Sequence, residues 1–168
     1  MEHTPDSIIE IPILPHVKCV LIGIYGPEPI MANNTNLLGK ALEHLIANRY
    51  TQEDPVVLGP MRCELIKMAI SLRLKPHYMA FKPAFSLGVF FEKMFHKILH
   101  QHVIAQARCN RPVKVAIRDF YDLYNLTEEM YPFASAEDSY YRFLRHNSNL
   151  SIPRQPKGRI NPNNYASN

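Results

Sequence analysis

Residues 86–108 read SLGVFFEKMFHKILHQHVIAQAR, and this stretch decides the fold. Its apolar side chains recur every three or four residues, which is the spacing of one face of an α-helix. A stripe this wide packs against a core, or against the same stripe of a second subunit. We therefore expect a long helix from Ser86 to Arg108, and a homodimer through the 86–108 helix is the alternative use of its apolar face. The face consists of Leu87, Phe90, Phe91, Met94, Phe95, Ile98, Leu99 and Val103.

Four shorter helices are predicted around the long one. Pro15 suits the first turn of a helix that ends at Gly26-Pro27. Asn33 to Asn36 supply side-chain oxygens that can cap a second helix, which is expected to end near Tyr50. An amphipathic helix is expected over 113–126. Ser135, with an acidic residue three places on, resembles a capping box and marks the expected start of the last helix.

Two segments alternate apolar and polar residues with the period of a β-strand. The first covers 8–14, where Pro12 favours an edge strand because proline cannot donate a backbone hydrogen bond. The second covers 64–74, for which a helix remains the alternative, and we expect it to pair with 8–14 or with 77–81. The prediction is therefore an α+β fold, mainly α-helical with about five helices, a small two- or three-stranded sheet, and a helical hairpin near the C-terminus.

Length and composition indicate one globular domain. The chain has 168 residues, of which 46% are hydrophobic and only 20% are charged, a composition that supports a core and differs from that of disordered chains. We expect a flexible N-terminus over 1–7, a single globular domain over 8–147, and a basic, Pro/Asn-rich flexible tail over 148–168.

The apolar run over 8–25 is interrupted by prolines and charged residues. It is therefore expected neither to span a bilayer nor to act as a signal peptide, and the predicted location is cytoplasmic. Three widely spaced cysteines, Cys19, Cys63 and Cys109, are odd in number and lie among apolar neighbours. This pattern favours reduced thiols in the core over a disulfide framework.

The charge of the chain is unevenly distributed. The formal net charge is +4, yet no Asp or Glu occurs from Ser139 to Asn168, a stretch that contains five Arg and Lys residues. Such asymmetry is typical of a segment that faces a polyanion.

Two parts of this basic stretch are candidate DNA-binding elements. The helices over 113–126 and from Ser135 resemble a helix-turn-helix, in which the second helix offers Arg142, Arg145 and His146 to DNA. The connection is longer than a standard DNA-binding turn, so a purely structural hairpin is the alternative. The tail adds three cations that can follow the phosphate backbone, and an inert solvated terminus is its alternative. These tail residues are Arg154, Lys157 and Arg159.

The sequence lacks the motifs of an enzyme. It contains no glycine-rich phosphate loop, no Gly-x-Ser-x-Gly elbow and no Cys-x-x-Cys pair. His96 and His100 share a helix face and could chelate a metal ion, but no acidic residue lies between them, so a solvated or interface histidine pair is favoured. We expect no catalytic residue, no metal, no cofactor and no small-molecule substrate.

Three stretches together resemble a group of known proteins. They are IPILPHV from Ile11 with Tyr25-Gly26, LGVFFEKMFH from Leu87, and AIRDFYDLYN from Ala116 with YRFLRHN from Tyr141. They resemble small, uncharacterised proteins of bacterial phages and of integrated or conjugative mobile elements, which are presumed to associate with DNA. The resemblance implies a DNA-binding regulator or accessory protein of a phage or mobile element. A non-enzymatic protein-interaction or assembly component of such an element is the alternative.

Overall fold

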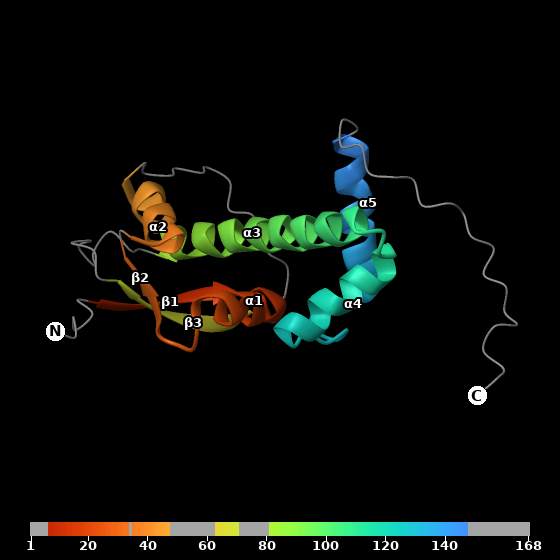
Figure 1. Ribbon diagram of the computed structural model, residues 1–168. Helices are drawn as coiled ribbons and strands as arrows, with labels where there is room; N and C mark the ends of the chain where they lie inside the picture. The colour runs from red at the N-terminus through yellow and green to blue at the C-terminus, as the bar shows by residue number, and fades with distance from the viewer. Residues whose placement is uncertain (1–6, 34, 48–62, 71–80, 148–168) are drawn as a thin grey trace, which may run out of the picture.

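The computed structural model describes residues 7–33, 35–47, 63–70 and 81–147 (Figure 1). In these ranges the chain forms five helices and three strands, so the α+β, mainly helical fold is confirmed. The order is β1 (Ser7–Ile13), α1 (Pro15–Tyr25), β2 (Ile30–Ala32), α2 (Leu37–Ala47), β3 (Glu64–Ile70), α3 (Phe81–Arg108), α4 (Val113–Tyr124) and α5 (Phe133–His146).

The three strands form one sheet in the order β1-β3-β2. β1 and β3 are antiparallel, with Ile11 opposite Ile66, whereas β2 runs parallel to β3. The predicted strand in the second alternating segment is thus confirmed over Glu64–Ile70, and so is its pairing with β1. Pro12 lies in β1, which is an edge strand as predicted. Residues 71–74 and 77–80 lie outside the described residues. β2 was not predicted because three residues are too short to show an alternating pattern.

The long helix α3 is the centre of the core. One face of it lies on the inner side of the sheet and on α1 (Figure 1). Phe91, Phe95 and Leu99 are completely buried there. The approach to β1 is close, because a Cβ atom at Gly88 would lie 2.5 Å from the Pro12 carbonyl oxygen. The apolar stripe is thus covered within the chain itself and needs no second subunit, so the homodimer stays a prediction.

Two predicted helix starts are wrong. α3 begins at Phe81 instead of Ser86, because Pro83 falls in the first turn, where a missing backbone N–H costs nothing. α5 begins at Phe133 with Pro132 as its N-cap, and Ser135 makes no capping hydrogen bond. The backbone N–H of Ser135 instead donates to the Pro132 carbonyl at 2.9 Å, inside the first turn.

The predicted side-chain cap of α2 is confirmed. Asn36 Oδ1 accepts a hydrogen bond from the backbone N–H of Gly39 at 2.7 Å, which satisfies one of the free donors at the start of the helix. α1 also begins at Pro15, as predicted, and α4 ends at Tyr124, followed by Asn125 in the left-handed conformation.

The cysteines are free, as predicted, but they are not core residues. Cys19 is half-buried, and Cys63 and Cys109 are exposed. Successive side chains of β3 point to opposite faces of the sheet. Apolar residues near Cys63 in the sequence therefore do not require Cys63, which directly precedes the strand, to be buried.

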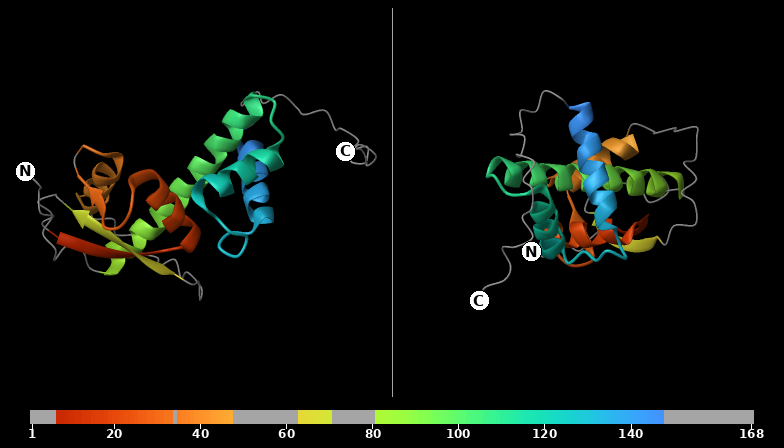
Figure 2. Two further views of the ribbon diagram at one scale, coloured as in Figure 1. Left: turned by 60° about the horizontal axis from the view of Figure 1, so that its bottom comes forward. Right: turned by 90° about the vertical axis from the view of Figure 1, so that its right-hand side faces the viewer.

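The molecule has two ends, which α3 connects (Figure 2). The sheet, α1 and α2 surround the first part of α3, and α4 and α5 pack on its second part. α5 crosses α3, and its C-terminal turns project beyond it (Figure 1). Within the described ranges, none of the helices is both long enough and apolar enough to cross a bilayer.

Candidate nucleic-acid interface

The predicted contact residues of the last helix lie together on its surface. Arg142, Arg145 and His146 are all exposed, and their spacing of three and four residues places them on neighbouring positions of α5. Within the described part of the chain, neither arginine forms an ion pair with a carboxylate. The other three predicted contacts, Arg154, Lys157 and Arg159, lie outside the described residues.

The opposite face of α5 holds the helical hairpin to the core. Ala136 and Tyr140 are completely buried, and α4 buries Phe120 in the same core. The hydroxyl of Tyr121 donates a hydrogen bond to the carbonyl oxygen of Tyr131 at 2.7 Å, which ties α4 to the loop before α5. The hairpin is therefore structural on its inner face, while its outer face remains open to a ligand.

The exposed side of α3 carries further cations that the sequence analysis missed. Lys93, Lys97 and Arg108 are exposed there. Lys93 is three residues from His96 and Lys97 is three residues from His100, so both lysines border the line where α5 crosses α3. The sequence did indicate an excess of positive charge on this helix, because Glu92 is the one acidic residue between Phe81 and Arg108.

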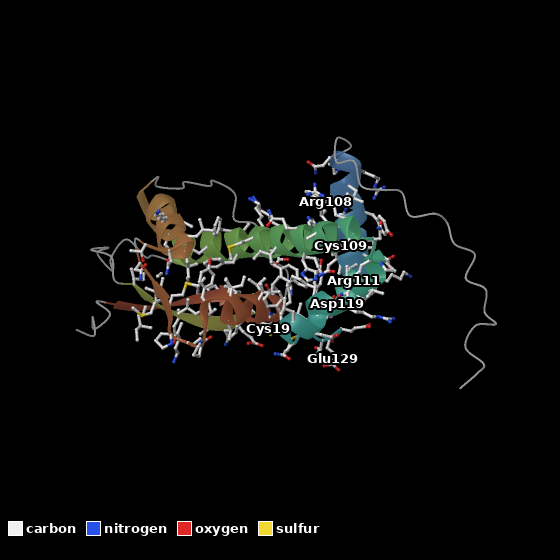
Figure 3. The ribbon with its side chains drawn as sticks, viewed as in Figure 1. Cys19, Arg108, Cys109, Arg111, Asp119 and Glu129 are labelled. Atoms are coloured by element: carbon white, nitrogen blue, oxygen red, sulfur yellow. The ribbon has the colours of Figure 1, made fainter. Side chains whose placement is uncertain are left out.

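The nearby carboxylates are mostly engaged or remote. Asp119 pairs with Arg111 at the junction of α3 and α4 (Figure 3). Figure 3 also shows Arg108 on the side from which α5 projects and Glu129 on the opposite side. Asp138 is the exception, because it is exposed on α5 one turn before Arg142.

A buried polar cluster lies beneath this surface, where α1 and α3 meet. The His16 ring is only 4% exposed and lies between the rings of Phe95 and Tyr131, at centroid distances of 4.5 and 4.7 Å. His16 Nε2 lies 3.3 Å from Glu92 Oε2, and His96 Nε2 lies 3.3 Å from Glu92 Oε1. Burial alone would raise the pKa of Glu92, but hydrogen bonds from the two histidines lower it to about 2.

Ser139 connects this cluster to α5. Its Oγ lies 3.0 Å from His96 Nδ1 and 2.9 Å from His100 Nε2. Burial, followed by the charge of His96, lowers the pKa of His100 to about 4. These partners are about forty residues apart in the chain, so no local pattern in the sequence could have revealed the cluster.

The contacts of His96 and His100 bear on whether this histidine pair could bind a metal ion. His96 and His100 share a face, as predicted, but one ring nitrogen of each is directed at Ser139 Oγ. Among the described residues, no group of three histidines, cysteines or acids is arranged to hold a metal ion. Ser139, His96 and Glu92 follow one another in the order of a nucleophile, a base and an orienting acid, but the serine oxygen is also engaged by His100. The hydrogen bonds of Ser139 join α3 to α5.

No protein family, curated protein or solved structure matches the chain.

Proposed function

We propose that this chain is a non-enzymatic protein that binds DNA through the exposed cations of α3 and α5. The observation that carries the proposal is the exposure of Arg142 and Arg145 on α5 without a carboxylate partner in the described part of the chain. We name this region the α3/α5 cation surface, and it consists of Lys93, Lys97, Arg108, Arg142, Arg145 and His146.

Unpaired exposed cations have the chemistry that phosphate recognition requires. Each lysine or arginine that neutralises a phosphate releases condensed counterions, which is the main source of sequence-independent affinity for DNA. A cation already bound to a carboxylate must give up that partner first. The basic tail from Arg154 to Arg159 belongs to the same proposal, as an additional contact to the phosphate backbone.

The helix dipole accounts for only part of this charge pattern. Arg145 and His146 lie in the last turn of α5, where cations stabilise the negative end of the helix. Lys93 and Lys97 lie in the middle of α3, where no such stabilisation is available. A surface that spans both helices is better explained by an external anion.

The test is a mobility-shift titration with duplex DNA at about 50 and about 200 mM salt. We expect Arg142→Ala/Arg145→Ala to weaken binding at least about tenfold and to reduce the slope of log affinity against log salt by about 2. The control is Lys40→Ala/Lys67→Ala, which removes the same charge from exposed positions on α2 and β3. Equal losses for both variants, or no binding by the parent protein at low salt, would overturn the proposal.

A protein-binding role is the second candidate, and the outer face of the sheet supports it. Ile8 and Leu65 are 57% and 53% exposed there, and Met31 is also exposed. Stable co-purification of a partner that is lost in Ile8→Ser/Leu65→Ser would favour this role. The setting of a phage or mobile element, for either role, rests on the sequence resemblance.

A further inference from the structure

When His96 and His100 are both neutral, the hydrogen bonds around Ser139 have one consistent set of donors and acceptors. Glu92 is ionised and can only accept, so His96 Nε2 carries a proton and donates to it, which leaves His96 Nδ1 as an acceptor. The Ser139 hydroxyl then donates to His96 Nδ1, and its oxygen accepts from His100 Nε2–H. His96 Nδ1, His100 Nε2 and the Ser139 hydroxyl each then have a partner of the opposite kind.

A single added proton can be accommodated on His96. Its Nδ1 then donates to Ser139, the hydroxyl turns toward His100, and His100 changes tautomer, so that its proton lies on Nδ1 and its Nε2 can accept. A second proton on His100 makes both rings donate to Ser139 Oγ, which has two acceptor sites, so the hydroxyl hydrogen must turn to another partner, such as the Tyr131 side chain. The cost of this second proton is that two positive rings then lie 6.0 Å apart, one of them on the buried His100.

Among the residues that the structure describes, no carboxylate pairs with His100 to compensate that second charge. The His100 residue is 8% exposed and contacts the rings of Tyr140 and Phe143 from α5. On the α1 side, Glu92 is already shared by His16 and His96. Beyond them lie Tyr131, whose pKa is raised to about 12 by burial and by Glu92, and the cation Arg142. Tyr131 therefore stays neutral and supplies no negative charge.

We infer that Ser139, His96 and His100 form a clasp that docks α5 on α3 while His100 is neutral, and that acidification opens the clasp and weakens DNA binding. The DNA part of this inference rests on the proposed function. α5 carries half of the α3/α5 cation surface, so release of α5 separates its arginines from Lys93 and Lys97. Regulation by protons thus acts on the position of the cations and not on their charge.

The sign of the effect makes the inference testable. Acidification makes a protein more positive, so a simple electrostatic surface binds DNA more tightly as the pH falls. The clasp predicts the opposite for the parent protein between about pH 7.5 and about pH 5.0. In His100→Gln, a neutral amide keeps the donor to Ser139, and DNA binding should no longer weaken on acidification.

Amide hydrogen exchange tests the clasp without DNA. Because His100 titrates near 6.5 when undocked and near 4 when docked, we expect protection of α5 to fall about thirtyfold at about pH 5.0, after correction for intrinsic rates. The β1 and β3 amides serve as the internal control, and His100→Gln should abolish the fall. Ser139→Ala should lower α5 protection already at about pH 7.5.

The outcomes separate the clasp from the proposed function. Unchanged α5 protection in the parent protein overturns the clasp, whatever the DNA result. A loss of α5 protection with no DNA binding at any pH supports the clasp and overturns the DNA proposal. DNA binding that strengthens equally in the parent and His100→Gln supports the cation surface and overturns the proton regulation.

Discussion

The two ends of the molecule use their cations differently. At the sheet end, Lys18 Nζ lies 3.1 and 3.5 Å from two carboxylates, and Lys67 lies 3.9 Å from Glu10 on the neighbouring strand. At the helical end, Arg142 and Arg145 have no carboxylate partner in the described part of the chain. A modest net charge of +4 therefore conceals a contrast between sheet-end lysines that hold strands and helices together and two α5 arginines that remain available. Other cations of the helical end, Arg111 and Lys114, are paired.

The two ends meet at Phe95 on α3. Its ring contacts His16 from α1, Phe120 from α4 and Tyr131 from the loop before α5, at centroid distances of 4.5, 6.0 and 5.1 Å. One side chain thus joins the sheet end to the helical hairpin. The ends should unfold together as long as this contact is intact.

Removal of this junction is expected to have the largest effect. Phe95→Ala should lower the free energy of unfolding by about 3 to 5 kcal/mol, because it leaves a cavity where four elements meet. Urea denaturation followed by circular dichroism measures this loss. Leu123→Ala is the control, since Leu123 is 60% exposed and should cost less than about 0.5 kcal/mol. Equal costs for the two variants would contradict the role of Phe95.

Acidification should act mainly on the helical end. His100 has its pKa lowered to about 4 by burial and His96, so the unfolded chain binds the proton first and stability falls as the pH drops from about 6.5 to about 4. Glu92 has its pKa lowered to about 2, so its contribution is present above about 4.5 and is lost between about 4.5 and about 2. Each group accounts for up to about 3 kcal/mol. Urea midpoints across this pH range measure both losses.

Glu92→Gln separates the two titrations. The amide has no charge to lose, so the variant should be less stable near neutrality and should show no steep loss below about pH 4.5. Its loss between about pH 6.5 and about pH 4 should persist, because His100 is unchanged. A variant that is as pH-dependent as the parent below about pH 4.5 would rule out Glu92 as the source.

The contact between α4 and the loop before α5 should have a smaller effect. Tyr121→Phe removes the hydroxyl that donates to the Tyr131 carbonyl and should cost about 1 kcal/mol in the free energy of unfolding. Tyr141→Phe is the matched control, since Tyr141 is exposed and no hydrogen bond of its hydroxyl is seen in the described part of the chain. Similar costs for both variants would show that the Tyr121 bond does not stabilise the hairpin.

Local patterns predicted the elements, but not how the polar residues combine. The period of 3.6 in α3 and the period of 2 in β1 and β3 depend on neighbours in the chain, so their type and approximate bounds could be predicted. Arg142, Arg145 and His146 were predicted because they lie close together in one helix. Ser139 was not, because its hydrogen bonds to His96 and His100 arise only when α5 crosses α3.

The smallest predicted effect concerns Asp138, the exposed carboxylate that lies one turn before Arg142. If phosphate binds beside it, Asp138→Asn should strengthen DNA binding a few-fold, because one repulsive charge is removed from the α3/α5 cation surface. Glu10→Gln removes the same charge at the sheet end, where Glu10 faces Lys67, and should leave affinity almost unchanged at about 100 mM salt. Mobility-shift titrations of the two variants at equal salt compare these positions directly. If both variants gain equally, net charge governs binding, and the difference between paired and unpaired cations has no bearing on DNA.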